Sequence, residues 1–309
     1  MPLSAARRVA GVELGGSKCI CLLASGPDDI HRELRTATLG PTKTLAAIEE
    51  VLTEWHAEEN LRALGLASFG PLDLDPASAE FGSIVGTPKP GWDRVALLSW
   101  AQRFAVPVGL DTDVNAAALA EGTWGSARGL KSWVYVTVGT GIGVGSIVDG
   151  KAVRGLGHSE AGHLRVPRRP ESRHPGNCPF HGDCVEGLAS APAIQARAGL
   201  PIQEIPDDHP VWTEVAHALT SLFHNLILTV VPERIVVGGG IMLGRPQLLP
   251  RIRSMLCASL GDYAHGSRIA LHIQEFLVMP ALGERAGPLG AIALAQQALR
   301  SAGAPRNRR

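Results

Sequence analysis

Apolar positions along the chain fall into short runs of strand length, separated by turns of glycine and polar residues. One run ends at Gly15-Gly16-Ser17-Lys18, and a second begins directly after it. The same arrangement returns near residue 133, where two runs flank Gly139-Thr140-Gly141 and Asp149-Gly150 closes the next hairpin. A strand–turn–strand unit that occurs twice predicts two related α/β lobes. The expected strands are Val9–Leu14, Cys19–Ala24, Glu33–Leu39, Leu61–Phe69, Val106–Leu110, Trp133–Val138, Ile142–Val148, Arg234–Val237 and Ile269–Val278.

Between these runs, apolar residues recur at the spacing of one helix face. Leu45, Ile48, Leu52 and Trp55 follow this spacing. Residues 71–92 are rich in Pro, Gly, Asp and Ser, and a loop of this length in a compact domain usually has a function. The expected helices are Thr44–Glu58, one through Asn115–Glu121, Val185–Ala198, Val211–Val230, Leu248–Leu260 and Pro288–Arg300, followed by a frayed, polar and basic tail, Ser301–Arg309.

Composition and charge narrow the class of protein. Hydrophobic residues make up 45% of the 309 residues and charged residues 19%, which is typical of a folded chain with one large domain or two. The 29 basic and 29 acidic side chains cancel, which argues against a nucleic-acid binder. No apolar run reaches the ~18 residues that a bilayer crossing needs, and no signal peptide is recognisable. The five cysteines are too sparse for a disulfide framework, so we expect a reduced, cytoplasmic protein without membrane contact.

Three glycine clusters lie at the ends of expected strands. Gly15–Lys18 is followed by a strand rather than a helix, which excludes both a Walker A loop and a dinucleotide fingerprint. Backbone N–H groups of such turns can still hold phosphates. The third cluster, Gly238-Gly239-Gly240, has no side chains and suits a flat ring or a ribose. A single turn of this kind is an ordinary hairpin, but three at strand ends predict a nucleotide site.

These motifs resemble those of the ROK family of sugar kinases. Glu13–Lys18 resembles its first phosphate motif, Val138–Gly145 its second, Asp111–Ala118 its catalytic segment and Glu160–His163 its sugar and zinc motif. Glu13 replaces the usual Asp and reaches one methylene further. This carboxylate and Cys178–Cys184 make the chain most similar to the ROK fructokinases.

The resemblance implies an α/β, two-lobed, actin-like ATPase (ribonuclease H-like) fold with a cleft between the lobes. Residues 1–115 would form the small N-terminal lobe, joined by the C-terminal helix 287–309, and residues 116–286 the large lobe with a zinc-binding loop. The implied cofactors are ATP, Mg²⁺ and a structural Zn²⁺. The implied nucleotide-binding residues are Gly15, Gly16, Ser17, Lys18, Thr140, Gly141, Pro192, Gly238, Gly239, Gly240, Ile241 and Met242.

A cluster of cysteine and histidine suggests a metal site. Cys178, His181 and Cys184 offer three ligands within seven residues, and structural zinc needs four. The fourth must come from upstream: the family resemblance implies His163, and His174 is the local alternative. Cys19, Cys21 and Cys257 are expected in the core.

The resemblance implies a substrate and a catalytic base. Asp113 lies at an expected strand–helix junction, where an Asp can be either a helix cap or a base, and Asp111 is the alternative. The family motif falls on Asp113. Thr87, Asn115, Glu160 and His163 are the implied sugar-binding residues. The implied reaction is transfer from ATP to the 6-hydroxyl of D-fructose. A homodimer is expected only because closed dimers are the commonest assembly. The alternatives are a glucokinase or N-acylhexosamine kinase, and a sugar-sensing ROK regulator. Regulators of this family carry a DNA-binding helical segment before the first phosphate motif, and the ten residues that precede Gly11 are too few for one.

Overall fold

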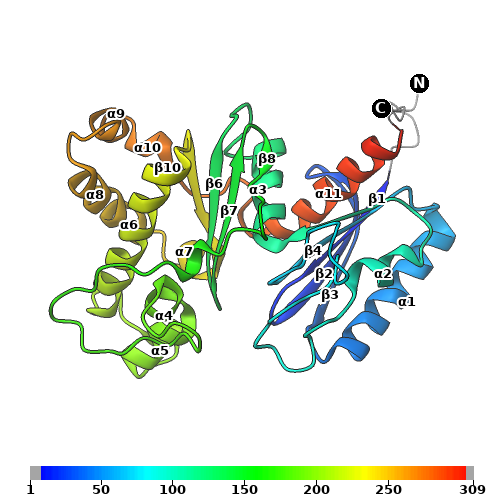
Figure 1. Cartoon of the computed structure of the whole chain (residues 1–309), viewed down its shortest axis with the longest axis horizontal. Helices are drawn as coiled ribbons and strands as arrows, with labels where there is room; N and C mark the ends of the chain where they lie inside the picture. Colours follow the sequence, from blue (N-terminus) through cyan, green and yellow to red (C-terminus); the bar gives the residue numbers. More distant parts are fainter. Residues whose placement is uncertain (1–7, 304–309) are drawn as a thin grey trace. The chain divides into compact units, whose positions relative to one another are not determined.

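The computed structural model describes residues 8–303 and divides the chain into two α/β units (Figure 1). The first unit runs to Gly125, includes Arg154–His158 and resumes at Arg285. The second comprises Ser126–Val153 and Ser159–Glu284. Helix α3 (Asp113–Trp124) therefore belongs to the first unit, because it packs on the C-terminal helix α11 (Ala286–Gly303).

The first unit is built on a five-stranded sheet in the order β3-β2-β1-β4-β5. The first three strands pair antiparallel, whereas β1–β4 and β4–β5 pair parallel. Each expected strand of this unit is present, with bounds that differ by a few residues. The strands are β1 Val9–Leu14, β2 Lys18–Gly26, β3 Asp29–Ala37, β4 Leu64–Ser68 and β5 Val108–Thr112.

The second unit repeats this topology. Its sheet has the order β10-β9-β6-β7-β8, in which β6, β7 and β8 pair antiparallel and β9 and β10 continue in parallel. The predicted internal repeat is thus confirmed at the level of strand order. The strands are β6 Trp133–Val138, β7 Ile142–Val148, β8 Lys151–Ala152, β9 Arg234–Gly238 and β10 Leu277–Val278.

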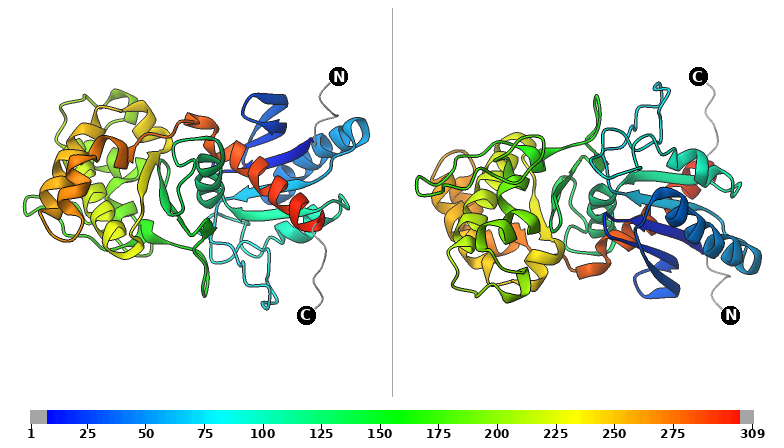
Figure 2. Two further views of the ribbon diagram at one scale, coloured as in Figure 1. Left: turned by 90° about the horizontal axis from the view of Figure 1, so that it is seen from above. Right: turned by 90° about the horizontal axis from the view of Figure 1, so that it is seen from below.

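Helix α11 lies directly against the first sheet because a row of glycines makes room for it (Figure 2). Gly11, Gly65 and Gly109 are register partners on β1, β4 and β5. A Cβ on Gly65 would lie 1.8 Å from the carbonyl oxygen of Ala291, and Gly11 and Gly109 are similarly close to the backbone of α11. Only glycine allows so close an approach between a strand and a helix.

The remaining helices of the first unit are α1 (Pro41–Glu59), which the apolar spacing predicts, and α2 (Leu97–Gln102), which it does not. In α1 the buried face comprises Ile48, Leu52 and Trp55. Residues 71–92 contain turns and isolated bridges, in agreement with the predicted long loop, and Ile84 and Trp92 anchor this loop in the core.

Two expectations for the second unit are wrong. Val185–Ala198 is not one helix: Ser190 is extended and separates α4 (Val185–Ala189) from α5 (Ala191–Ala198). Pro192 lies in the first turn of α5, where its missing N–H costs nothing, whereas inside one continuous helix it would break the hydrogen-bond ladder. Ile269–Val278 is not one strand: it forms the second half of α9 and all of α10, and only its last two residues pair as β10. The other helices are α6 (Val211–Val230), α7 (Gly239–Gly244), α8 (Leu248–Leu260), α9 (Gly266–Leu271), α10 (Ile273–Phe276) and the 3₁₀ turns Ala161–His163, Ile202–Glu204 and Gly283–Arg285.

The spacing of buried residues explains the second error. Ile269 and Phe276 are buried and Ile273 is half-buried, which is helical spacing, whereas Leu271 is 79% exposed. A strand with alternating faces would have buried Leu271 as well.

Each unit has its own hydrophobic core. The first core is formed by β1, β2 and β4 with α1 and the loop through Trp92. The second is formed by β6, β7 and β9 with α4, α6 and α8. Within residues 8–303, no helix has the length and apolar content needed to cross a bilayer. Ser301–Gly303 continue α11, and the rest of the predicted frayed tail lies outside the described residues.

Candidate active site and metal centre

The first glycine turn connects β1 to β2. The amide of Gly15 donates to the carbonyl of Lys18 at 3.0 Å, which closes the turn. Thr38, just after β3, holds the turn at two points: its hydroxyl donates to the Gly15 carbonyl at 2.7 Å and its amide to that of Ser17 at 3.0 Å. Gly16, Ser17 and Lys18 are exposed. The turn is therefore a fixed frame with accessible backbone and a lysine, which suits a phosphate.

The second turn, Gly139–Gly141 between β6 and β7, is held by the segment around α4 and α5. The Gly139 carbonyl accepts from the Ala191 amide at 2.7 Å, beside the exposed Pro192. The Ile142 amide donates to Oε2 of Glu186 at 3.0 Å. The break between α4 and α5 therefore has a structural role, because it exposes the Ala191 N–H to the turn.

The third glycine cluster lies beside the second turn. Gly238 ends β9, and Gly239, with φ of 85°, begins α7 rather than a loop. A Cβ on Gly239 would lie 2.4 Å from the Val138 amide, so the backbones of β6 and α7 are in contact there. Ile241 and Met242 are buried, so a nucleotide would meet their backbone rather than their side chains. The predicted nucleotide residues of this unit are thus brought together.

The two candidate carboxylates of the catalytic segment have different surroundings. Asp111 is 1% exposed; its Oδ2 lies 2.6 Å from the Arg154 guanidinium and its Oδ1 accepts from Asn115 Nδ2 at 2.8 Å. Asp113 is half-buried and is the first residue of α3. Neither is the helix cap that the sequence suggested: the hydroxyl of Thr112 accepts from the Asn115 amide and is the cap.

Asp113 also shares its environment with Glu13. Burial raises the pKa of Glu13 to about 7, with a further contribution from the charge of Asp113, while Lys18 and Arg35 oppose the shift. The Glu13 carboxylate lies against α11, since a Cβ on Gly287 would be 2.0 Å from its Oε1. Glu13, just before the first glycine turn, is therefore within electrostatic reach of both Asp113 and the exposed Lys18.

Four metal-ligating side chains converge in the second unit. The ligand atoms of His163, Cys178, His181 and Cys184 all lie within 4.8 Å of one another. Four of the separations are 3.6 Å (Cys178–His163), 3.8 Å (Cys178–His181), 3.3 Å (His181–His163) and 3.5 Å (Cys184–His163). Zinc–sulfur bonds of about 2.3 Å and zinc–nitrogen bonds of about 2.0–2.1 Å place tetrahedral ligands roughly 3.3–3.8 Å apart. The donor set fits a structural zinc.

The alternative ligand, His174, is not in this group. Its Nδ1 accepts from the Gly176 amide at 3.1 Å, so it orders the loop ahead of Cys178. His163 instead supplies Nδ1, and its Nε2 faces outward, 4.0 Å from carboxylate oxygens of both Glu160 and Glu186. Both carboxylates lie next to this nitrogen, although 4.0 Å is longer than a hydrogen bond.

Glu186 is a functional candidate that the sequence reasoning missed. One of its oxygens faces His163 and the other accepts from Ile142, so it connects the metal loop to the second glycine turn. Gly162 strengthens the connection, because a Cβ there would lie 1.8 Å from the Ile142 carbonyl. The sequence signal that could have identified Glu186 was its position two residues after the metal ligand Cys184.

The other predicted sugar residues are distributed over the two units. Asn115, 2% exposed, uses its amide nitrogen to hold Asp111, so it would meet a ligand through its oxygen. Thr87 is half-buried in the long loop, where its hydroxyl accepts from the Lys89 amide at 3.4 Å. These two belong to the first unit with Asp113, whereas Glu160 and His163 belong to the second.

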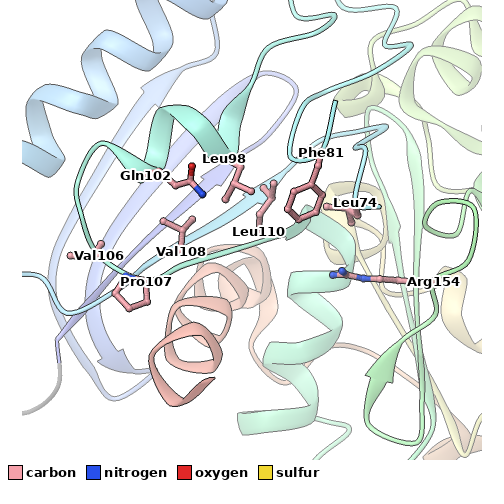
Figure 3. A pocket seen from close by; sticks show the side chains of 9 residues that line it. All are labelled: Leu74, Phe81, Leu98, Gln102, Val106, Pro107, Val108, Leu110 and Arg154. Atoms are coloured by element: carbon pink, nitrogen blue, oxygen red, sulfur yellow. The ribbon is translucent and has the colours of Figure 1, made fainter. Parts of the chain in front are cut away.

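A separate cavity of about 490 Å³ lies in the first unit along β5 and α2 (Figure 3). It is mainly apolar, and Arg154, the partner of Asp111, lies at its edge. None of the predicted site residues lines it. Its lining residues are Leu74, Phe81, Leu98, Gln102, Val106, Pro107, Val108, Leu110 and Arg154.

Two α/β units of one sheet topology, each with a glycine turn between its first two strands, define the actin-like ATPase fold, here with a metal-binding loop in the second unit. A family model described as the ROK family matches residues 9–298. The chain belongs to the ROK family.

Relatives and solved structures agree with this assignment. A fructokinase from Zymomonas mobilis is 38% identical over 293 residues, which are 92% of this chain and 95% of that protein. A fructokinase from Pediococcus pentosaceus is 34% identical over 295 residues, or 95% and 99% of the two chains. The crystal structure of a ROK hexokinase from Thermus thermophilus matches with a TM-score of 0.73 at 26% identity, covering 95% of this chain and 99% of that one.

Proposed function

We propose that this protein is an ATP-dependent fructokinase that transfers a phosphoryl group to the 6-hydroxyl of D-fructose. The observation that carries the proposal is the similarity, at 34–38% identity over nearly the whole chain, to proteins named fructokinase. The accessible Asp113 at the start of α3 supports a catalytic role rather than sugar binding alone.

In this proposal Asp113 accepts the proton of the attacking hydroxyl. It is the better base of the two carboxylates because Asp111 is buried and its oxygens are engaged by Arg154 and Asn115. The proposed sugar-binding residues are Thr87, Asn115, Glu160 and His163. A positioned base of this kind typically contributes about 10²–10⁴-fold to the rate.

The glycine turns would hold the nucleotide. Backbone N–H groups of Gly15–Lys18 and Gly139–Gly141 bind phosphates, and the Lys18 ammonium adds a positive charge. The backbone of Gly238–Met242 and Pro192 would receive the nucleoside. Mg²⁺, when bound with ATP, neutralises charge on the phosphates, and Glu13 is the carboxylate that stands at the corresponding position of the family motif.

The zinc has a supporting role in this proposal. His163, Cys178, His181 and Cys184 complete four ligands and leave no open position for a reacting water. Because His163 contacts Glu160 and Glu186, the metal fixes a sugar-binding carboxylate and, through Ile142, the second turn.

The test is a coupled ADP-release assay with purified protein, Mg-ATP and a panel of fructose, glucose, mannose and N-acetylmannosamine. Fructose should have the highest kcat/KM, and Asp113→Asn should lower the fructose-dependent rate by roughly 10²–10⁴-fold. A higher kcat/KM for glucose would favour the glucokinase alternative, and nucleotide-independent sugar binding without turnover would favour a regulator.

The proposal includes a homodimer in the cytoplasm. Closed dimers are the commonest assembly of soluble enzymes, and all five cysteines are free thiols, two of them in the metal group. Light scattering coupled to size exclusion should give twice the mass of one 32.5 kDa chain.

A further inference from the structure

Lys89 reaches the first glycine turn from a distant part of the sequence. Its ammonium group donates a hydrogen bond to the carbonyl of Gly16, at the tip of the turn between β1 and β2. It also lies 5.7 Å from the centre of the Phe69 ring, a cation–π distance. Lys89 is therefore fixed beside the backbone that would hold the ATP phosphates.

The backbone of Lys89 is held in place as well. Trp92, three residues later, is fully buried, packs edge-on against Phe69 with ring centres 5.2 Å apart, and donates to the Leu39 carbonyl at 3.0 Å. On the other side, the Thr87 hydroxyl accepts from the Lys89 amide. A lysine anchored on both sides loses little additional entropy when it binds a ligand.

The charge of Lys89 has no acidic partner among the described residues. In residues 8–303, no carboxylate lies within ion-pair distance of its Nζ. An ammonium group has three donors, and Gly16 takes one. Burial raises the pKa of the neighbouring Cys19 thiol, and the positive charge of Lys89 opposes that shift, so its field reaches the base of the turn.

We propose that Lys89 binds the terminal phosphate of ATP, as a second cation beside Lys18 on the first glycine turn. The inference deepens the proposed kinase function and depends on it. Lys89 would supply the donors left over from Gly16 to the oxygens of the phosphoryl group that is transferred. ADP lacks this group, so the contribution of Lys89 should depend on the third phosphate.

The experiment compares ATP and ADP binding by calorimetry, with Mg²⁺ and without sugar. Lys89→Met removes the charge and keeps the length of the side chain. It should weaken ATP binding by roughly 10- to 100-fold, the range for one hydrogen bond to a charged group, and change ADP binding by less than about 3-fold. Lys89→Arg should restore most of the ATP affinity. Lys43→Met, at an exposed lysine of α1, is the matched control and should change neither.

Equal weakening of ATP and ADP would mean that Lys89 only holds the Gly16 carbonyl, and would overturn the proposal; so would unchanged ATP binding. A fall in the thermal midpoint of Lys89→Met with equal loss of both nucleotides would overturn it as well. Because no sugar is present, a failure of the fructose assignment appears only in the hexose panel. The two proposals can therefore fail separately.

Discussion

Asp111 and Asp113 are two residues apart, yet burial and neighbours give them different chemistry. Asp111 neutralises Arg154 inside the first unit, and Asp113 remains half-exposed at the first turn of α3. Both oxygens of Asp111 are occupied by protein partners, Arg154 and Asn115, and its side chain is hidden from solvent. The surroundings of Asp111 thus suit a structural role, and the accessibility of Asp113 supports its proposed role as the base.

Asp113→Asn should lower kcat by roughly 10²–10⁴-fold while leaving ATP binding nearly unchanged, because it removes the base without changing size. Steady-state kinetics with calorimetric ATP binding measures both. Asp111→Asn is the matched control: it should lower the midpoint of thermal unfolding, since it leaves Arg154 without its charged partner. If Asp111→Asn instead lost turnover at unchanged stability, the base would be Asp111.

Glu13 should make stability depend on pH. Its folded pKa of about 7 is above the ordinary value of 4.5, chiefly through burial and then through Asp113. A group with a raised folded pKa contributes stability that is complete below the unfolded pKa and is lost as pH rises through the folded one. That window runs here from about pH 4.5 to about pH 7.

Below pH 4.5, Glu13→Gln should therefore have the same free energy of unfolding as the natural protein. Between pH 4.5 and 7 its free energy of unfolding should become the larger of the two, and above pH 7 the difference should stay constant. Urea unfolding in Mg²⁺-free buffer across this range is the measurement. Glu204→Gln, at an exposed carboxylate, should show no such divergence. If the free energies of unfolding of Glu13→Gln and of the natural protein differed by the same amount at every pH, Glu13 would be ionised as readily in the folded as in the unfolded state.

At the scale of elements, the contact between α11 and the first sheet depends on three glycines in register. Gly11, Gly65 and Gly109 stand side by side on β1, β4 and β5, and each is close to the backbone of α11. Because the neighbouring atoms are backbone, they cannot rotate away from a new methyl group.

Gly65→Ala should destabilise the first unit by about 1–3 kcal/mol or more, because its Cβ would overlap the Ala291 carbonyl. Denaturant unfolding measures the change. Gly244→Ala, at the end of α7 where nothing lies within 4 Å of the added Cβ, should be neutral or slightly stabilising. Equal effects of the two substitutions would mean that α11 can shift to accommodate the methyl group.

At the scale of the whole molecule, two separate cores imply two stability centres. All four metal ligands belong to the second unit, and structural metal binding is coupled to folding. Loss of zinc should therefore weaken one unit and spare the core of the other.

Calorimetry should show zinc-depleted protein unfolding in two transitions, the earlier one from the second unit, and zinc-loaded protein should have that transition at a higher temperature. Metal analysis should find about one Zn²⁺ per chain. Cys178→Ser should reproduce the depleted profile, and His174→Ala should retain the metal. A chelated sample with an unshifted profile would exclude a structural metal.

Local sequence determined several strands, a hairpin and a helix face of this protein. The strands around Gly15–Lys18 and Gly139–Gly141, the hairpin at Asp149-Gly150 and the apolar face of α1 follow from interactions between residues a few positions apart. Turn chemistry and hydrophobic spacing act over that range, so they can be read without a structure. The order of the motifs was likewise sufficient to indicate the family that the comparisons establish.

Only the tertiary structure decided the rest. Leu271 was predicted in a strand, but in the folded protein it is an exposed helix residue. The helix predicted across Pro192 is interrupted, which lets the Ala191 amide bind the second turn. Glu186 became a site candidate through partners 23 or more positions away, and Lys89 through Gly16, 73 positions away. Such contacts depend on how strands and helices pack. Local spacing cannot encode them, because the two partners are brought together only when the chain folds.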